Sequence, residues 1–164
     1  MRSWIFYNML GLAVALNSGI AAGGEPALDP VVIRAIAEVE VRTGDQGRSA
    51  THLVSADRVV SGDQIIYTLE VRNTAASTVH APTVTYAVPK HMKYVADSAV
   101  GPGAEVSFSV DGGRNYDSPE NLEIATADGR RAAAAADYTH IRWQLSRDLK
   151  ANSVAFVRFR ALVK

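Results

Sequence analysis

Hydrophobic and polar residues alternate along most of the chain after residue 30, and this alternation constrains the fold more than any other feature of the sequence. Residues 63–73 are the clearest case: only Ile66 breaks the pattern, and one face carries Ile65, Tyr67, Leu69 and Val71. A period of two places such residues on one side of an extended strand. Turn-forming residues flank this segment, which indicates a strand between two tight turns.

The same alternation predicts strands over residues 33–41, 83–88, 92–95, 104–110, 121–126, 141–145 and 155–163. Residues 43–49 are polar and are predicted to form a loop, and the alanine-rich residues 130–137 are predicted to form a connector. About seven to nine short strands without a convincing amphipathic helix predict an all-β, antiparallel sandwich. The core is expected to contain the inward-facing side chains Tyr67, Leu69, Tyr86, Phe108, Trp143 and Phe159.

Residues 1–22 have the residue order of a secretory signal peptide. A positive Arg2 precedes an apolar run from Trp4 to Leu16, and small residues allow cleavage after Ala22. As a helix the run extends about 20 Å, against about 30 Å for a hydrocarbon core, so export is favoured and an uncleaved anchor is the alternative. We expect an extracytoplasmic protein, periplasmic or secreted, without a membrane span after signal cleavage.

Charge and cysteine content restrict the possible functions. The 164 residues include 17 basic and 17 acidic side chains and no Cys. Nucleic-acid binders usually carry a concentrated basic surface, so no nucleic-acid partner is expected. Without Cys there is no disulfide, thiolate zinc site or thiol nucleophile. No serine-hydrolase elbow or phosphate loop occurs either, so the sequence predicts neither an enzyme nor a bound cofactor.

Several segments resemble, in order, a bacterial surface-repeat domain catalogued as domain of unknown function eleven. The resemblance begins with Val59-Val60-Ser61-Gly62-Asp63 and ends with Phe156-Val157-Arg158-Phe159-Arg160-Ala161. It implies an exported, immunoglobulin-like sandwich of bacteria, without catalytic residues, over residues 53–164. Residues 23–52 are then an N-terminal segment with an added strand. Ser61 stands where the family usually has proline, and Ala75 where it often has glycine.

A local motif is similar to the Asp-box turn that sialidases repeat. It consists of Ser109, Asp111, Gly113, Asn115 and Tyr116. The carboxylate of Asp111 can accept backbone N–H groups and the glycines can adopt positive φ, so the motif predicts a structural hairpin turn. A propeller enzyme needs several such blades, and this chain has room for about one.

Two sets of residues carry metal-ligand chemistry. Asp111, Asn115, Asp117 and Glu120 carry the oxygen atoms that calcium favours, but Leu122 occupies the position where a calcium loop needs glutamate. A solvated acidic loop is therefore the preferred interpretation. The histidines at positions 52, 80, 91 and 140 lack metal-ligand spacing, so no metal is predicted.

The expected function is a non-catalytic, exported module for protein–protein contact or cell-envelope architecture. Its partner would be another envelope or surface protein. The alternative is a small carbohydrate-binding module of the cell surface, because exposed aromatic rings bind sugars. Tyr94 and Tyr116 lie in or beside predicted loops and are the candidate contacts for a glycan or a partner.

The segment from Arg34 to Arg42 carries charged residues on one face and precedes the family-like region. Exposed sheet edges can recruit another strand. We expect this segment to cover an edge of its own domain, since intramolecular pairing avoids the entropy cost of association. Pairing with a neighbouring molecule is the alternative.

Overall fold

The computed structural model describes residues 30–45 and 48–164, so the predicted signal peptide lies outside the described residues. Ten strands are present in the described part: β1 (Val31–Asp45), β2 (Arg48–Ser55), β3 (Gln64–Asn73), β4 (Thr83–Ala87), β5 (Met92–Tyr94), β6 (Ala104–Ser109), β7 (Glu123–Thr126), β8 (Gly129–Ala132), β9 (His140–Leu145) and β10 (Val154–Val163). Two short 3-10 turns, Pro119–Asn121 and Ala135–Asp137, lie before β7 and before β9.

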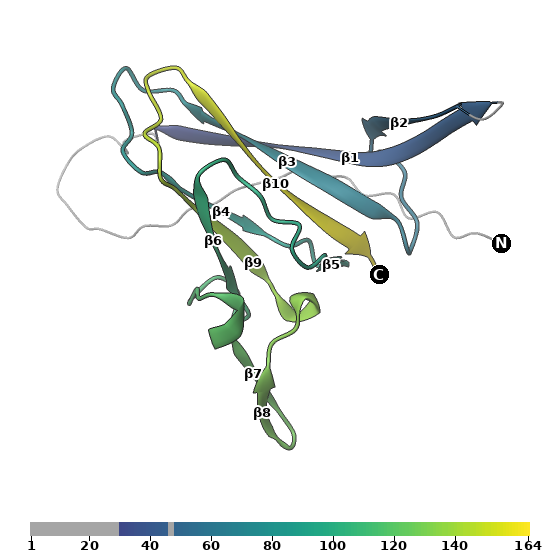
Figure 1. The fold of residues 1–164 in the computed structure, drawn as a ribbon. Helices are drawn as coiled ribbons and strands as arrows, with labels where there is room; N and C mark the ends of the chain where they lie inside the picture. Colours follow the sequence, from purple (N-terminus) through teal and green to yellow (C-terminus); the bar gives the residue numbers. More distant parts are fainter. Residues whose placement is uncertain (1–29, 46–47) are drawn as a thin grey trace.

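The strands form two main sheets, and all paired strands are antiparallel. One sheet has the order β2-β1-β3-β10-β5 and the other has the order β4-β9-β6 (Figure 1). These sheets confirm the predicted all-β antiparallel sandwich, with ten strands rather than seven to nine. Among the described residues, no helix is long and apolar enough to cross a membrane.

The core lies between the two sheets. Tyr67 and Phe159 of the five-stranded sheet stack with ring centroids 4.8 Å apart, and Trp143 of the three-stranded sheet lies 6.2 Å from Phe159. Leu69 and Phe108 are also buried, and Tyr86 is partly buried against the same cluster. The core side chains therefore occupy the phase of the alternation that points between the sheets.

The N-terminal strand is longer than the sequence indicates. Its first part, Val31 to Val39, pairs with β3, as the edge-covering interpretation expects. Its last part, Glu38 to Asp45, pairs with β2 on the other side. The predicted loop over residues 43–49 is therefore wrong, because cross-strand hydrogen bonds hold residues 43–45 and 48–49 in strands. The segment before residue 53 adds most of two strands, and the expected boundary between residues 52 and 53 falls inside β2.

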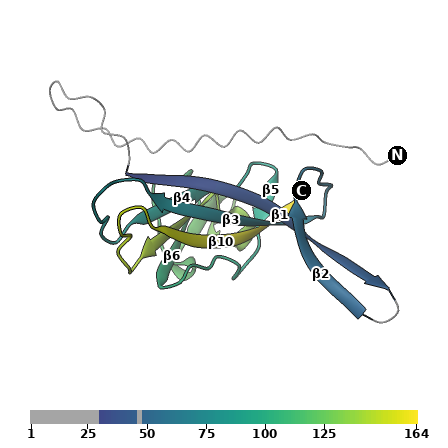
Figure 2. The ribbon, with the colours of Figure 1, turned by 90° about the horizontal axis from the view of Figure 1, so that it is seen from above.

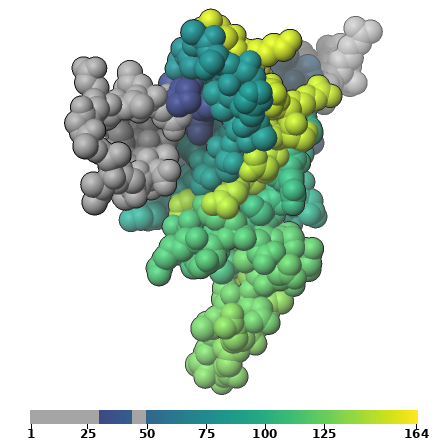
Figure 3. Space-filling model, turned by 90° about the vertical axis from the view of Figure 1, so that its left-hand side faces the viewer, coloured from purple at the N-terminus to yellow at the C-terminus, as the bar shows by residue number. Residues whose placement is uncertain are grey.

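Two hairpins project from the sandwich. We call residues 40–45 and 48–53 of β1 and β2 the arm, because they extend past the end of β3 (Figure 2). The second hairpin, β7–β8, pairs Glu123 with Ala132 and extends from the body of the molecule at the bottom of Figure 3. Arg131 at its base donates two hydrogen bonds to Asp137, which lies in the predicted alanine-rich connector.

Candidate interaction surface

The Asp-box-like motif forms a closed turn after β6. Ser109, whose side chain is fully buried, donates its hydroxyl to Asp111 Oδ1 at 2.8 Å and accepts the Gly113 N–H at 2.9 Å. Asp111 Oδ1 also accepts the backbone N–H groups of Arg114 and Asn115 at 3.0 Å. Gly112 and Gly113 have φ of 80° and 85°, which favours glycine. The motif is organised by its own hydrogen bonds.

These hydrogen bonds set the electrostatics of the loop. Donors from Asn115 and Ser109 hold the pKa of Asp111 well below its usual range, because they stabilise the carboxylate. Asp117 accepts the Asn121 side-chain amide at 2.9 Å, and that bond lowers the pKa of Asp117. Among the described residues, no three His, Asp or Glu side chains gather in a group that could hold a metal ion.

Tyr94 is not the exposed ring that the sequence indicates. Its side chain is 4% exposed, and its ring centroid lies 5.1 Å from that of Phe108 and 5.8 Å from that of Tyr138. Its hydroxyl accepts the Ala99 N–H at 2.9 Å, and burial raises its pKa. The prediction of Tyr94 as a glycan contact is therefore wrong. Tyr94 is the last residue of β5, which pairs with β10, and its side chain points into the core.

Tyr116 is partly buried and already has a partner on one ring face. The guanidinium of Arg142 lies 3.6 Å from its ring centroid, within the range of a cation–π contact. Arg142 lies on β9, between Thr85 of β4 and Ser107 of β6, so Tyr116 covers the outer face of the three-stranded sheet. The two predicted glycan contacts are thus not brought together as an exposed aromatic platform.

Two exposed apolar side chains, Phe156 and Val100, lie close together on the outer face of the five-stranded sheet. Phe156 on β10 is 52% exposed, and Val100, whose backbone pairs with Arg158, is 54% exposed. With Thr68, Pro102, Val157 and Arg158 they line an open depression of about 450 Å³. We call Thr68, Val100, Pro102, Phe156 and Arg158 the Phe156 surface.

Charged and polar groups form the margin of the Phe156 surface and lie beside it. Arg158 donates from Nε to the Thr68 hydroxyl at 3.1 Å. The carboxylate of Glu70, which is opposite Phe156 on β3, accepts a hydrogen bond from Arg72 at 2.6 Å. An apolar centre with a polar rim is the usual composition of a surface that contacts another protein.

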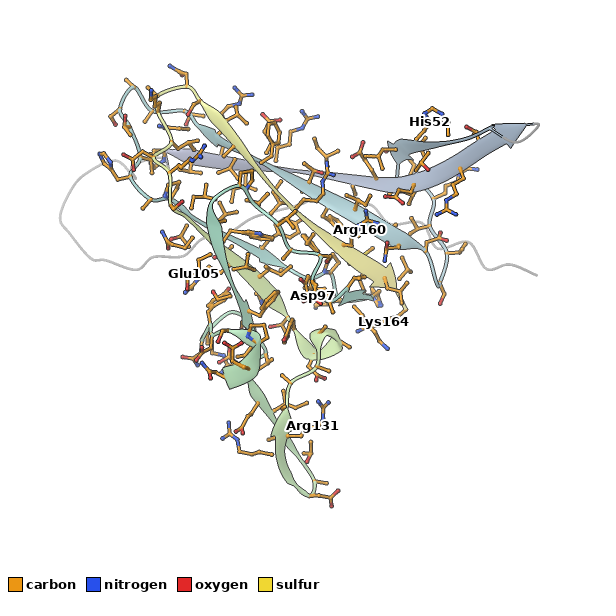
Figure 4. All side chains as sticks on the ribbon, viewed as in Figure 1. His52, Asp97, Glu105, Arg131, Arg160 and Lys164 are labelled. Atoms are coloured by element: carbon orange, nitrogen blue, oxygen red, sulfur yellow. The ribbon has the colours of Figure 1, made fainter. Side chains whose placement is uncertain are left out.

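A second depression of about 400 Å³ lies further along the same face. Arg160 donates to Gln64 and to Glu40, each at 3.0 Å, and these side chains with Arg42 line the depression over Ile66. Ile66, the one residue that breaks the alternation of its strand, is 1% exposed even though it faces outward. In Figure 4, Arg160 lies on β10 within the body of the sheet and His52 lies on the arm.

Sequence reasoning missed the Phe156 surface, although a signal for it was present. Phe156 occupies the polar phase of a strand that otherwise presents Arg158 and Arg160 outward. An aromatic residue in that phase must lie on the outer face of the sheet. Val100 and Pro102 have no such signal, because they lie in a loop whose pairing with β10 is a tertiary feature.

Two of the histidines considered as metal ligands, His80 and His140, lie in different surroundings. Nδ1 of His80 lies 2.8 Å from a carboxylate oxygen of Asp148 at the surface. His140 is partly buried on β9, and desolvation lowers its pKa.

Comparisons with protein-family models, with curated proteins and with solved structures found no match to this chain.

Proposed function

We propose that the chain is an exported, non-catalytic β-sandwich module of the bacterial cell envelope that contacts another envelope or surface protein. The observation that carries this proposal is the exposed Phe156 with Val100 beside it on the outer face of the five-stranded sheet. Exposing an aromatic side chain of this size to water is unfavourable, and a partner that covers it gains the corresponding hydrophobic free energy.

The rest of this surface suits a protein partner. Arg158 supplies hydrogen-bond donors beside the ring, and arginine next to an aromatic residue is a frequent combination in the energetic centres of interfaces. Export rests on the residue order of the first 22 residues. The carbohydrate-binding alternative loses its main support, because Tyr94 is buried and Tyr116 is covered on one face by Arg142.

Site-specific photo-crosslinking in the native host tests the proposal. A photoreactive phenylalanine analogue replaces Phe156, and a matched chain carries it at Thr83, on the outer face of the other sheet. We expect one defined protein adduct from position 156 and none from position 83. Equal labelling at the two positions, or no adduct at position 156, contradicts the proposal.

A further inference from the structure

The outer strands of the two sheets differ in how well they are protected from pairing with another chain. β5 has three residues and includes Lys93, and β4 has five residues between Pro82 and Pro89. β6 is covered by its own loop, since Phe108 and Asp117 exchange backbone hydrogen bonds of 2.9 and 3.0 Å. Short strands, lysine, proline and covering loops are common ways of blocking a sheet edge.

Among the described residues, nothing of this kind protects β2 over residues 50–55. It has eight residues, and Ala50 to Ser55 includes no Asp, Glu, Lys, Arg or Pro. Leu53 is 41% exposed and Val54 is 43% exposed, on opposite faces of the strand. No strand of the described chain pairs with its outer side. A partly apolar edge without Asp, Glu, Lys or Arg over six residues favours the addition of a strand.

The hydrogen-bonding phase of β2 shows which backbone groups are available. Ala56 donates its N–H to Ala37 on β1. Because hydrogen bonds alternate along an antiparallel pair, residues 50, 52 and 54 also direct their backbone N–H and C=O groups toward β1. Thr51, Leu53 and Ser55 therefore direct theirs to the outer side. These three alternate residues each offer a donor and an acceptor to an incoming antiparallel strand.

We infer that the β2 edge binds the β2 edge of a second copy of this chain, antiparallel about a two-fold axis at Leu53. This register places Leu53 opposite Leu53 of the second copy, Thr51 opposite Ser55 and His52 opposite Val54. Over residues 51–55 no like charges oppose each other, and Leu53 and Val54 each gain an apolar or aromatic neighbour. A two-fold axis makes the contact closed, because each copy uses the same patch.

The arm itself points to a second copy as the occupant. Beyond β3 it consists of two strands, and an isolated two-stranded hairpin is only marginally stable in water. Pairing residues 51–55 of two copies would join their sheets in the order β1-β2-β2-β1, and the contact would lie at the base of each arm, where β2 leaves the sandwich. This inference does not depend on the Phe156 surface, because that surface lies on β10 and the arm lies on β1 and β2.

Sedimentation equilibrium of the purified chain over a wide concentration range tests this contact. We expect a reversible monomer–dimer equilibrium for the unmodified protein. L53K places two lysines opposite each other and should raise the dissociation constant at least tenfold. L162K is the matched control, because Leu162 is 38% exposed on β10 and Leu53 is 41% exposed. It should dimerise like the unmodified chain.

Chemical crosslinking gives a second measurement that does not depend on the lysine variants. The chain has no Cys, so L53C and L162C each introduce a single thiol. A short bismaleimide should join two copies through position 53 and leave position 162 unjoined. A protein that stays monomeric at every concentration, equal weakening by L53K and L162K, or no crosslink at position 53 overturns the inference.

Discussion

Asn73, at the end of β3, is a buried polar residue whose side chain makes several hydrogen bonds. Its side-chain amide donates to the carbonyls of Ser77 and Leu149 at 2.8 Å and approaches that of Lys150 at 3.1 Å. Its carbonyl oxygen accepts the Ala75 N–H at 2.9 Å. One fully buried asparagine thus joins the loop after β3 to the loop before β10.

Removing this amide should be costly, because its partners would be left in a poorly solvated site. We expect N73A to lower the free energy of unfolding by about 2–4 kcal/mol. N121A is the matched control: Asn121 is exposed and bonds Asp117, so its loss should cost less than about 1 kcal/mol. Urea unfolding of both variants measures the difference, and equal losses would show that burial of Asn73 contributes nothing.

Single residues also show how far the sequence predicts the structure. Trp143 and Tyr67 lie in the expected phase, because burial between two sheets is a strong and regular constraint. Ile66 and Phe156 both occupy the outer phase, yet one is buried and the other exposed. The difference depends on Arg160 and Glu40, which meet over Ile66 from separate strands, and no local pattern specifies that meeting.

At the scale of elements, the interior strands were predictable and the arm was not. Strands of the sandwich bury one face, which imposes the period of two on their residues. The arm has exposed residues on both faces, as Leu53 and Val54 show, so burial imposes no period of two on it. Backbone pairing between β1 and β2 and the Glu40–Arg160 ion pair at its base hold it instead. The polar, glycine-containing residues 43–49 therefore have the sequence pattern of a loop.

The turn after β6 gives a pH-dependent prediction at the same scale. The pKa of Asp111 is lowered in the folded protein, so the ionised carboxylate stabilises the fold above the unfolded-state pKa of about 4. That contribution is lost as the pH falls from about 4 through the lower, folded-state pKa.

We expect D111N to be less stable than the unmodified protein near neutral pH, with the gap narrowing as the pH falls below about 4. D128N, in the turn between β7 and β8, controls for the loss of one negative charge. Unfolding midpoints in urea across this pH range provide the measurement. A constant gap between D111N and the unmodified chain would show that the hydrogen bonds to the carboxylate do not depend on its charge.

In the whole molecule, different parts have different roles. The core between the sheets holds the sandwich together, the Phe156 surface faces outward from the larger sheet, and the arm extends beyond it. The Phe156 surface and the arm lie outside the core, so substitutions there can change association while the fold is retained. This separation makes the proposed contacts accessible to experiment.

Hydroxyl-radical footprinting of the protein in its native envelope, with the purified protein as reference, tests whether a partner covers Phe156. We expect oxidation of Phe156 to fall strongly in the envelope, because a partner covers the ring, while oxidation of Tyr116 on the opposite sheet stays the same. Equal oxidation of Phe156 in the two preparations, or protection of Tyr116 in place of Phe156, would contradict the proposed contact.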